Sequence, residues 1–291
     1  MDELDGLAAR FEASRPRLHA VAYRMLGSAA EADDAVQEAW LHLSRSGDDG
    51  VRNLGGFLTT VVARVCLDML RTRKSRREEF LDAQPGDAAG AAPDPESEAL
   101  LADSVGLAML IVLDTLAPAE RVAFVLHDMF DLPFDQIAGI TGRSPAAARQ
   151  LASRARRRVR GTSAVSGAAL GRQREVVEAF LAASRGGDFD ALLAVLDPDV
   201  ELHADAAATP AGMPGHVTGA VAVSRQARVF SARARFGRIV LIDGIPGLVL
   251  ARRGRLWLAL RLTIADGKIT EMDVVADPDR LSQLTLAMLA D

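Results

Sequence analysis

Apolar residues in the first 80 positions recur every three or four residues, which is the spacing of one face of an α-helix. One such series runs from Ala32 to Leu43 and a second runs from Phe57 to Met69. Four more helical patterns follow, punctuated by Pro118, Pro133 and Gly142: Leu107–Leu116, Val122–Met129, Phe134–Ile140 and Pro145–Arg160. The chain is therefore predicted to begin with two all-helical modules.

Beyond Gly171 the pattern changes to runs rich in Val, Ile and Leu that are separated by turn residues, as expected of strands. Two helical stretches, Glu175–Ser184 and Phe189–Leu196, come first. Strands are predicted at Val200–Ala204, Arg238–Ile242, Leu248–Arg252, Leu256–Ile264 and Lys268–Val275. Asp266-Gly267 is a strong hairpin signal, and a last helix is expected from about Asp279 to Leu289. This module is predicted to be an α+β domain.

Two stretches without an apolar period divide these modules. Residues 80–97 are rich in Pro, Gly, Ala and Asp, and residues 161–171 form a shorter break. A length of 291 residues suits more than one domain. The expected organisation is a helical module at 1–79, a linker at 80–98, a second helical module at 99–160, a short linker at 161–171 and the α+β domain at 172–291.

The composition limits the kinds of site and the compartment. Cys66 is the single cysteine, so neither an intrachain disulfide nor a cysteine-rich zinc site can form. No apolar run reaches the ~18 residues of a membrane span, and the acidic N-terminus is unlike a secretory signal. We expect a cytoplasmic protein without a cofactor. No metal-ligand spacing is visible in the sequence, so no metal site is expected either.

The net charge of −5 conceals a segregated distribution. Residues 64–77 contain six basic side chains and one acid, residues 143–160 contain seven arginines and no acid, and residues 78–98 between them contain seven acids and no base. A single run of this kind is usually a solvated helix face. Two basic surfaces flanking an acidic tether favour a partner that carries phosphates.

The segment from Phe134 to Arg157 has the layout of a helix-turn-helix. Gly142 suits a tight turn with positive φ, and Ser144 followed by Pro145 is an N-cap with a first-turn proline. In the helix that follows, one face is apolar and the other basic and polar. Bidentate base contacts are expected near its start and phosphate contacts later. The candidate DNA-binding residues are Ser144, Arg149, Gln150, Ser153, Arg154, Arg157 and Arg158.

At this point the sequence resembles a known family. The segment from Leu113 to Arg157 looks like region 4 of the extracytoplasmic-function (ECF) sigma factors of bacterial RNA polymerase, and the segments Arg24–Trp40 and Gly56–Arg71 look like region 2. The resemblance implies an alternative sigma factor that binds core polymerase through the β′ coiled coil and the β flap, and that recognises promoter DNA.

The resemblance also suggests roles for region 2 residues. The acidic face implied to dock on the β′ coiled coil comprises Asp33, Asp34, Gln37 and Glu38. The residues expected to follow phosphates near the minus-ten element are Arg64, Arg71, Arg73, Lys74, Arg76 and Arg77. Strand separation requires capture of an unstacked base, for which the loop Ser46–Gly56, with polar groups such as Asn53, is the candidate.

Residues 171–291 resemble a SnoaL-like, NTF2-like domain with a cone-shaped cavity, and a sigma factor with this extension is similar to the sigma-J-type subgroup. Asp277-Pro-Asp-Arg-Leu281 resembles that subgroup's Asn-Pro-Asp-Lys-Leu motif, whereas Asp205-Ala-Ala-Ala208 departs from its Asp-Gly-Gly-Gly motif. Candidate pocket residues are His203, Asp205 and Trp257, with His216 in a loop rich in Gly and Pro. The domain is expected to regulate the sigma modules in cis, with a small-molecule ligand as a candidate partner, and not to be an enzyme.

Two other functions stay open from the sequence. One is a ligand-responsive helix-turn-helix regulator that binds an operator without polymerase. The other is a SnoaL-like enzyme fused to a DNA-binding module. An ordinary regulator needs neither the acidic helix around residues 33–38 nor the basic helix that ends at Arg77.

Overall fold

The computed structural model describes residues 2–46, 53–81, 104–209, 212–252 and 255–289. The chain forms two compact units, one comprising residues 1–100 and 116–157 and the other residues 101–115 and 158–291. Within the described ranges, no helix is both long enough and apolar enough to cross a membrane.

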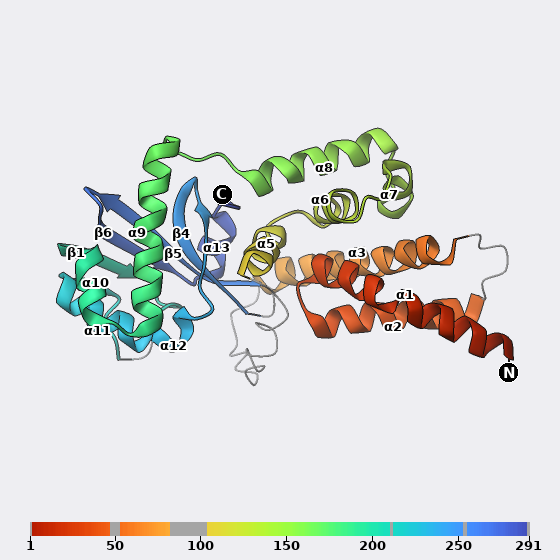
Figure 1. Ribbon diagram of the computed structural model, residues 1–291, viewed down its shortest axis with the longest axis horizontal. Helices are drawn as coiled ribbons and strands as arrows, with labels where there is room; N and C mark the ends of the chain where they lie inside the picture. Colours follow the sequence, from red (N-terminus) through yellow and green to blue (C-terminus); the bar gives the residue numbers. More distant parts are fainter. Residues whose placement is uncertain (1, 47–52, 82–103, 210–211, 253–254, 290–291) are drawn as a thin grey trace. The chain divides into compact units, whose positions relative to one another are not determined.

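The first unit is entirely helical in its described part, as the periodicity predicts. Three long helices, α1 (Asp2–Leu26), α2 (Ala29–Ser46) and α3 (Leu54–Leu81), pack side by side (Figure 1). They are followed by α6 (Pro118–Phe124), the π-helical turn η1 (Val125–Met129), α7 (Phe134–Thr141) and α8 (Pro145–Arg160), whose last residues belong to the second unit. The helix α3 packs against α6 and α7.

The amphipathic pattern of α2 explains its position in this unit. Ala32, Ala35, Val36, Ala39 and Leu43 are completely buried. These positions are spaced by three or four residues, so they form one stripe along the helix, and that stripe packs against α1 and α3. The opposite face of α2 is left exposed to solvent.

The predicted helix-turn-helix is confirmed in its local geometry. Gly142 ends α7 with φ of 67°, a left-handed conformation that glycine adopts without strain. The Ser144 hydroxyl then accepts a hydrogen bond of 3.2 Å from the Ala147 N–H, which caps α8. The apolar face of α8 is buried as expected, at Ala148, Leu151, Ala152, Ala155 and Val159.

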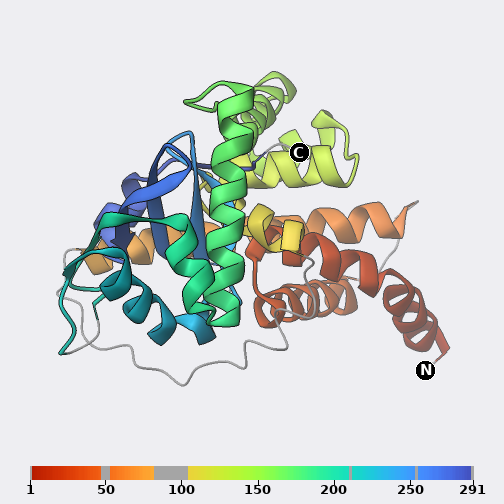
Figure 2. The same cartoon turned by 60° about the vertical axis from the view of Figure 1, so that its left-hand side comes forward.

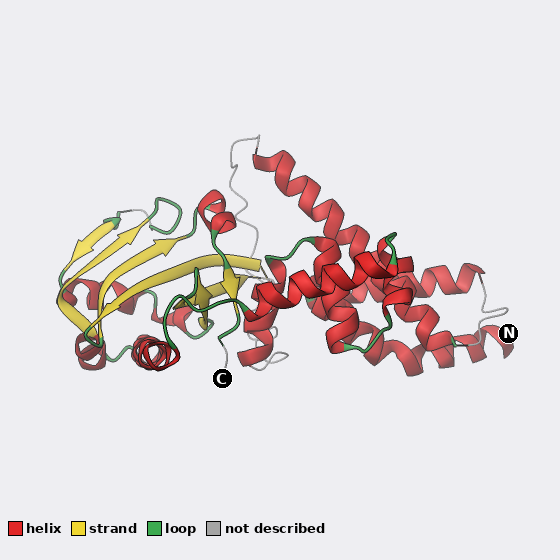
Figure 3. Ribbon diagram, turned by 90° about the horizontal axis from the view of Figure 1, so that it is seen from above, coloured by secondary structure: helices red, strands yellow, loops and turns green. Residues whose placement is uncertain are grey.

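The second unit is an α+β domain built on one curved sheet, which confirms the predicted fold class (Figure 3). Seven strands follow the order β2-β1-β6-β5-β4-β3-β7. Their bounds are β1 Leu196–Ala204, β2 His216–Thr218, β3 Arg238–Ile242, β4 Ile245–Arg252, β5 Arg255–Ala265, β6 Lys268–Val275 and β7 Leu286–Ala287. The described pairings are antiparallel except for β1 with β6, which is parallel.

Helices cover one face of this sheet and enclose its main core. They are α9 (Gly167–Gly186), α10 (Phe189–Val195), α11 (Ala220–Val229) and α12 (Ser231–Ala234). Figure 2 shows α9 in front of the sheet. Val177 and Phe180 of α9 belong to the same buried cluster as Leu248 and Leu260 of the sheet. Removal of these apolar side chains from water supplies the main driving force for folding of the domain.

A further helix, α5 (Ser104–Asp114), packs on β3 and β5 of the same sheet. Leu110, Ile111, Val112 and Leu113 are each fully buried, and four consecutive positions point to all sides of a helix. On the sheet, Val249 of β4 pairs with Ala259 of β5. Both residues are fully buried, although neither belongs to the main core cluster on the other face. The sheet is therefore buried on both faces at this end.

Two tight turns join strands through Asp-Gly pairs. Asp266-Gly267, which the sequence predicts, has φ of 50° and 75°, and Asp243-Gly244, which was not assigned, has φ of 52° and 85°. Positive φ at both central residues is the geometry that matches the twist of a hairpin.

Several elements differ from the predictions. The last helix, α13 (Pro278–Gln283), ends early, and the chain then pairs with β3 as β7. Two hydrogen bonds fix this pairing: the Asp243 N–H donates to the Thr285 carbonyl, and the Thr285 N–H donates to the Asp243 carboxylate. The helix α9 begins at Gly167, inside the expected short linker, and His216 lies in strand β2 and not in a loop. Most of the expected linker at 80–98 lies outside the described residues.

Candidate polymerase and promoter interfaces

The exposed face of α2 carries the four polar residues expected to bind polymerase. Asp33, Asp34, Gln37 and Glu38 are all exposed and lie opposite the buried stripe. Asp33 lies 3.4 Å from the His19 imidazole, and Glu38 lies 3.6 Å from the Arg45 guanidinium. Such surface pairs are weak, so these carboxylates can exchange partners at little cost.

The exposed face of α8 brings together most of the residues expected to contact DNA. Arg149, Gln150, Ser153, Arg154 and Arg157 are exposed along one side of the helix. Near the start of α8, the Arg149 guanidinium lies 5.2 Å from the Phe134 ring centroid. A stacked guanidinium keeps its donor edges free for a base.

Several of the residues predicted to contact DNA in this module already have intramolecular partners. The Arg154 guanidinium donates to Glu120 at 2.8 Å, and that carboxylate is largely buried. Ser144 is engaged as the cap of α8. Arg156, which was not among the candidates, pairs with Asp128 at 2.6 Å, and this contact raises its pKa.

The basic residues of α3 divide into surface and buried groups. Arg71, Lys74 and Arg76 are exposed, with Arg71 at 3.2 Å from Asp68. The side chain of Arg73 is only 16% exposed, because it binds Glu31 and the Leu26 carbonyl and so joins α3 to the α1–α2 turn. The side chain of Arg77 lies outside the described residues.

Arg64 makes a contact that the sequence did not suggest. Its guanidinium donates a hydrogen bond of 3.1 Å to the Gly139 carbonyl of α7. Arg64 is therefore shared between the α1–α3 helices and the helix-turn-helix within the first unit. A DNA phosphate would compete with that carbonyl for the same guanidinium.

Asn53 is the described polar residue of the loop expected to capture a base. Its Oδ1 accepts from the Gly56 N–H at 3.0 Å and caps α3, while the side chain stays exposed. Residues 47–52 of that loop lie outside the described part of the chain.

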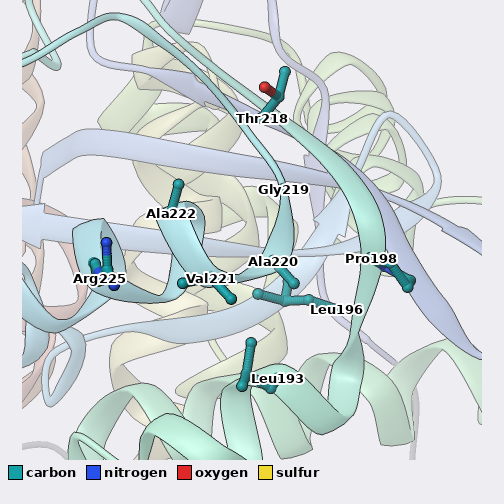
Figure 4. Close-up of a pocket in the computed structure, with 9 residues that line it drawn as sticks. All are labelled: Leu193, Leu196, Pro198, Thr218, Gly219, Ala220, Val221, Ala222 and Arg225. Carbon is teal, nitrogen blue, oxygen red and sulfur yellow. The ribbon is translucent and has the colours of Figure 1, made fainter.

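The second unit has an open cavity of about 480 Å³ where α10, β1 and α11 meet (Figure 4). Its lining is apolar apart from Thr218 and one guanidinium, that of Arg225. The predicted pocket residues His203, Asp205 and Trp257 are not among the lining residues. The Trp257 ring instead lies under the Arg233 guanidinium, whose Cζ is 5.3 Å from the centre of the Trp257 ring.

Asp205 links two sequence segments, the one that departs from a subgroup motif (residues 205–208) and the one that resembles a subgroup motif (residues 277–281). One carboxylate oxygen accepts from the Ala208 N–H at 2.8 Å, and the other accepts from the N–H groups of Ala276 and Asp277 at 2.9 and 2.8 Å. Burial by itself would raise the pKa of Asp205, but these backbone hydrogen bonds, together with Arg280 at 3.5 Å, bring it below the ordinary value. The carboxylate thus joins two backbone segments of the domain.

Sequence reasoning missed one cluster, formed by Glu201, His203 and His216. Glu201 and His203 are two apart in β1 and so share a face, and β2 places His216 directly opposite His203. The first relation could be found from strand alternation. The second requires the position of β2, a three-residue strand that gives almost no sequence signal.

Comparisons with known proteins identify two regions of the chain. Residues 10–76 match the family model of sigma-70 region 2, and residues 108–159 match that of sigma-70 region 4. The chain is 36% identical to the probable ECF RNA polymerase sigma factor SigI of Mycobacterium tuberculosis (strain ATCC 25618 / H37Rv), over 98% of each chain. It is also 36% identical to ECF RNA polymerase sigma factor SigJ of the same strain, over 94% of this chain and 93% of that one.

A solved structure gives a further match. The crystal structure of the M. tuberculosis extracytoplasmic function sigma factor SigJ is 32% identical, covers 94% of this chain and 98% of its own, and superposes with a TM-score of 0.45. From the two region matches and the full-length relatives, we conclude that the chain belongs to the ECF family of RNA polymerase sigma factors, the alternative sigma factors that direct promoter recognition and transcription initiation.

Proposed function

We propose that the exposed face of α2 docks on the β′ coiled coil of core polymerase, and that the α6–α8 module reaches the β flap. The proposal rests on the acidic and polar side chains at positions 33, 34, 37 and 38, all exposed on a helix whose other face is fully buried. A rigid acidic helix face suits a basic partner, because charge complementarity speeds association and fixes orientation.

Charge reversal tests this docking surface. We expect the double variant Asp34→Lys/Glu38→Lys to lose co-purification with core polymerase at moderate salt. The matched control is Glu175→Lys/Glu178→Lys on α9, which makes the same charge change at two exposed positions of the second unit. If both double variants bind core polymerase like the unmodified chain, α2 is not the docking surface.

We propose that α8 reads the minus-thirty-five element with Arg149 and Gln150, and that its later arginines hold phosphates. Residues near the start of a recognition helix contact base edges, whereas residues farther along face the backbone. The exposed basic residues of α3 are proposed to follow the minus-ten element, with the loop Ser46–Gly56 accepting the unstacked base.

We also propose that the second unit controls the sigma modules in cis. The supporting observation is that both ends of the region 4 segment belong to this unit: α5 packs on β3 and β5, and the Val159 carbonyl accepts from the Met288 N–H. A domain that holds region 4 at both ends can bias its position, provided that it binds two arrangements with different affinity.

A glycine pair offers a matched test of control in cis. Gly161 and Gly187 have φ of 61° and 64°, so alanine imposes similar backbone strain at either position. A Cβ at Gly161 would collide with Ala287, whereas the space around Gly187 is open. We expect Gly161→Ala to change initiation at least about fivefold and Gly187→Ala to leave it unchanged. Equal initiation by both, with α5 exchanging its amide hydrogens faster in Gly161→Ala, would refute the proposal.

Finally, we propose that the second unit is not an enzyme and that the protein acts in the cytoplasm, where core polymerase works. In support of the first point, the lining of the described cavity contains no carboxylate and no imidazole to transfer a proton. Apolar walls with one guanidinium suit an apolar ligand that carries an acidic group. Turnover of a cyclic ketone by the purified chain would overturn this assignment in favour of a SnoaL-like enzyme.

A further inference from the structure

Two histidines and a glutamate converge on one exposed patch of the sheet in the second unit. Glu201 and His203 point to the face of β1 opposite Val200 and Leu202, which are buried in the core. His216 comes from the edge strand β2, where it pairs in register with His203. All three side chains are about half exposed, so ions in solvent can reach them.

The donor atoms are spaced as a metal ion requires. The Glu201 Oε2 lies 3.2 Å from the His203 Nε2 and 3.8 Å from the His216 Nε2, and all three ligand atoms lie within 4.8 Å of one another. Zinc bonds of 2.0–2.1 Å in a tetrahedron place neighbouring donors about 3.3–3.4 Å apart. The present separations are close to that value, and binding further requires the two nearly parallel imidazole rings to turn so that both Nε2 lone pairs point at one ion.

The two imidazoles stack on each other. Their planes differ by 6° and their centroids lie 4.4 Å apart, with both Nε2 atoms near the same carboxylate oxygen. Cross-strand pairing brings the two Cβ atoms close and holds the rings together. Two nitrogen donors and one oxygen donor are therefore gathered before any ion binds.

The surrounding charges favour a cation. Glu271 of β6 is in register with Glu201 on the neighbouring strand and adds a second exposed carboxylate to this part of the sheet. Asp273, the partner of His203 in the same ladder, is already bound by the Arg280 guanidinium at 2.9 Å. The patch thus keeps two carboxylates next to the imidazoles, while Asp273 is paired with Arg280 and also lies 3.7 Å from the Arg261 guanidinium.

We propose that Glu201, His203 and His216 bind a divalent transition-metal ion of the zinc class. Imidazole nitrogens with one carboxylate are donors that suit zinc and its neighbours rather than magnesium or calcium. Three protein ligands leave one position of a tetrahedron for water. The ion fastens the three-residue edge strand β2 to β1, because its ligands come from both strands.

Metal titration of the full chain tests the site. The chain is prepared without a polyhistidine tag, stripped with chelator and titrated with Zn²⁺ in a calorimeter. We expect one ion per chain with a Kd below about 10 µM. The variants His203→Asn and His216→Asn should each weaken binding by at least about tenfold, since even outer partners of a ligand contribute that much. Glu201→Gln should weaken it in the same direction.

The matched control is His42→Asn, which removes another exposed imidazole, on α2. Zn²⁺ should bind this variant as it binds the unmodified chain, and should raise the unfolding temperature of both but not that of His203→Asn. The side chains to be changed lie on an exposed face, and melting without metal verifies that each variant is folded. The proposal is overturned if stoichiometric binding is absent, or if it persists unchanged in both His203→Asn and His216→Asn.

Discussion

The Met288 N–H donates a hydrogen bond of 2.7 Å to the Val159 carbonyl, joining the last described strand of the chain to the end of helix α8. Two residues later, Gly161 packs against Ala287, and the Ala164 N–H then donates to the Gly244 carbonyl. The segment after α8 is therefore fixed to the sheet along its first four residues.

Met288→Pro removes the donor of that hydrogen bond, because proline lacks an N–H, and it also fixes φ at position 288. The loss of one hydrogen bond, worth about 1 kcal/mol, should speed amide exchange in residues 284–287 about fivefold. Met288→Ala keeps the N–H and is the control. Hydrogen exchange read by mass spectrometry checks this, and equal rates in the two variants would show that the bond does not hold the junction.

Arg149→Ala should reduce binding to promoters that carry one particular base pair, by about 1–3 kcal/mol, and relax specificity at that position. Arg157→Ala should weaken binding to all sequences alike, since a phosphate contact carries no sequence information. Selection from a promoter library with reconstituted holoenzyme separates the two effects. A uniform loss with Arg149→Ala would contradict its assignment as a base-reading residue.

Asp205→Asn should destabilise the second unit by about 1–3 kcal/mol at neutral pH, because an amide cannot accept from all three backbone donors. The pKa of Asp205 is lowered in the folded chain, so its contribution is complete above the unfolded value of about 3.9 and is lost as the pH falls through the folded value. The difference in melting temperature from the unmodified chain should therefore shrink below about pH 4.

The control for that measurement is Asp279→Asn, which removes one exposed carboxylate from the start of α13. Its melting temperature should stay close to that of the unmodified chain across the same pH range. A constant difference between Asp205→Asn and the unmodified chain down to pH 2 would show that the charge of Asp205 is not what stabilises the turn.

Cys66 should be inert in the folded chain. Burial of its thiol in α3 raises the pKa to about 12, and the thiolate is the reactive form. A disulfide reagent at pH 8 should react only as fast as the first unit opens, with the rate rising as denaturant is added. In a Ser75→Cys variant, the exposed thiol on the same helix should react at once, and equal rates for the two cysteines would contradict the burial of Cys66.

The sequence predicted elements where one residue pattern determines both the element and its burial. The helix α8 begins at Pro145, because Gly142, Ser144 and Pro145 fix its start locally. It buries Ala148, Leu151 and Ala152, which share one face of a helix. Strands β3 and β6 match their predicted bounds, since their apolar runs end at turns. Local information was sufficient in these cases.

Other features depend on partners far away in the chain. The segment after Gln283 has a helical appearance but pairs with β3, because Asp243 and Thr285 bond to each other across the turn. The sequence predicts Arg73 as an exposed basic residue. Its guanidinium instead binds Glu31 and the Leu26 carbonyl, which lie 42 and 47 residues earlier in the chain. The pairing of His203 with His216 is likewise a property of sheet register. None of these contacts is visible in a local pattern.

This chain should give core polymerase its promoter specificity. The direct test is transcription initiation by reconstituted polymerase. Core polymerase is mixed with a random DNA library, with and without the purified chain, and the 5′ ends of the transcripts are sequenced. The chain should add transcripts that begin at a fixed distance downstream of one shared pair of elements. If the chain selects DNA sites without polymerase and adds no such transcripts, it is an operator-binding regulator and not a sigma factor.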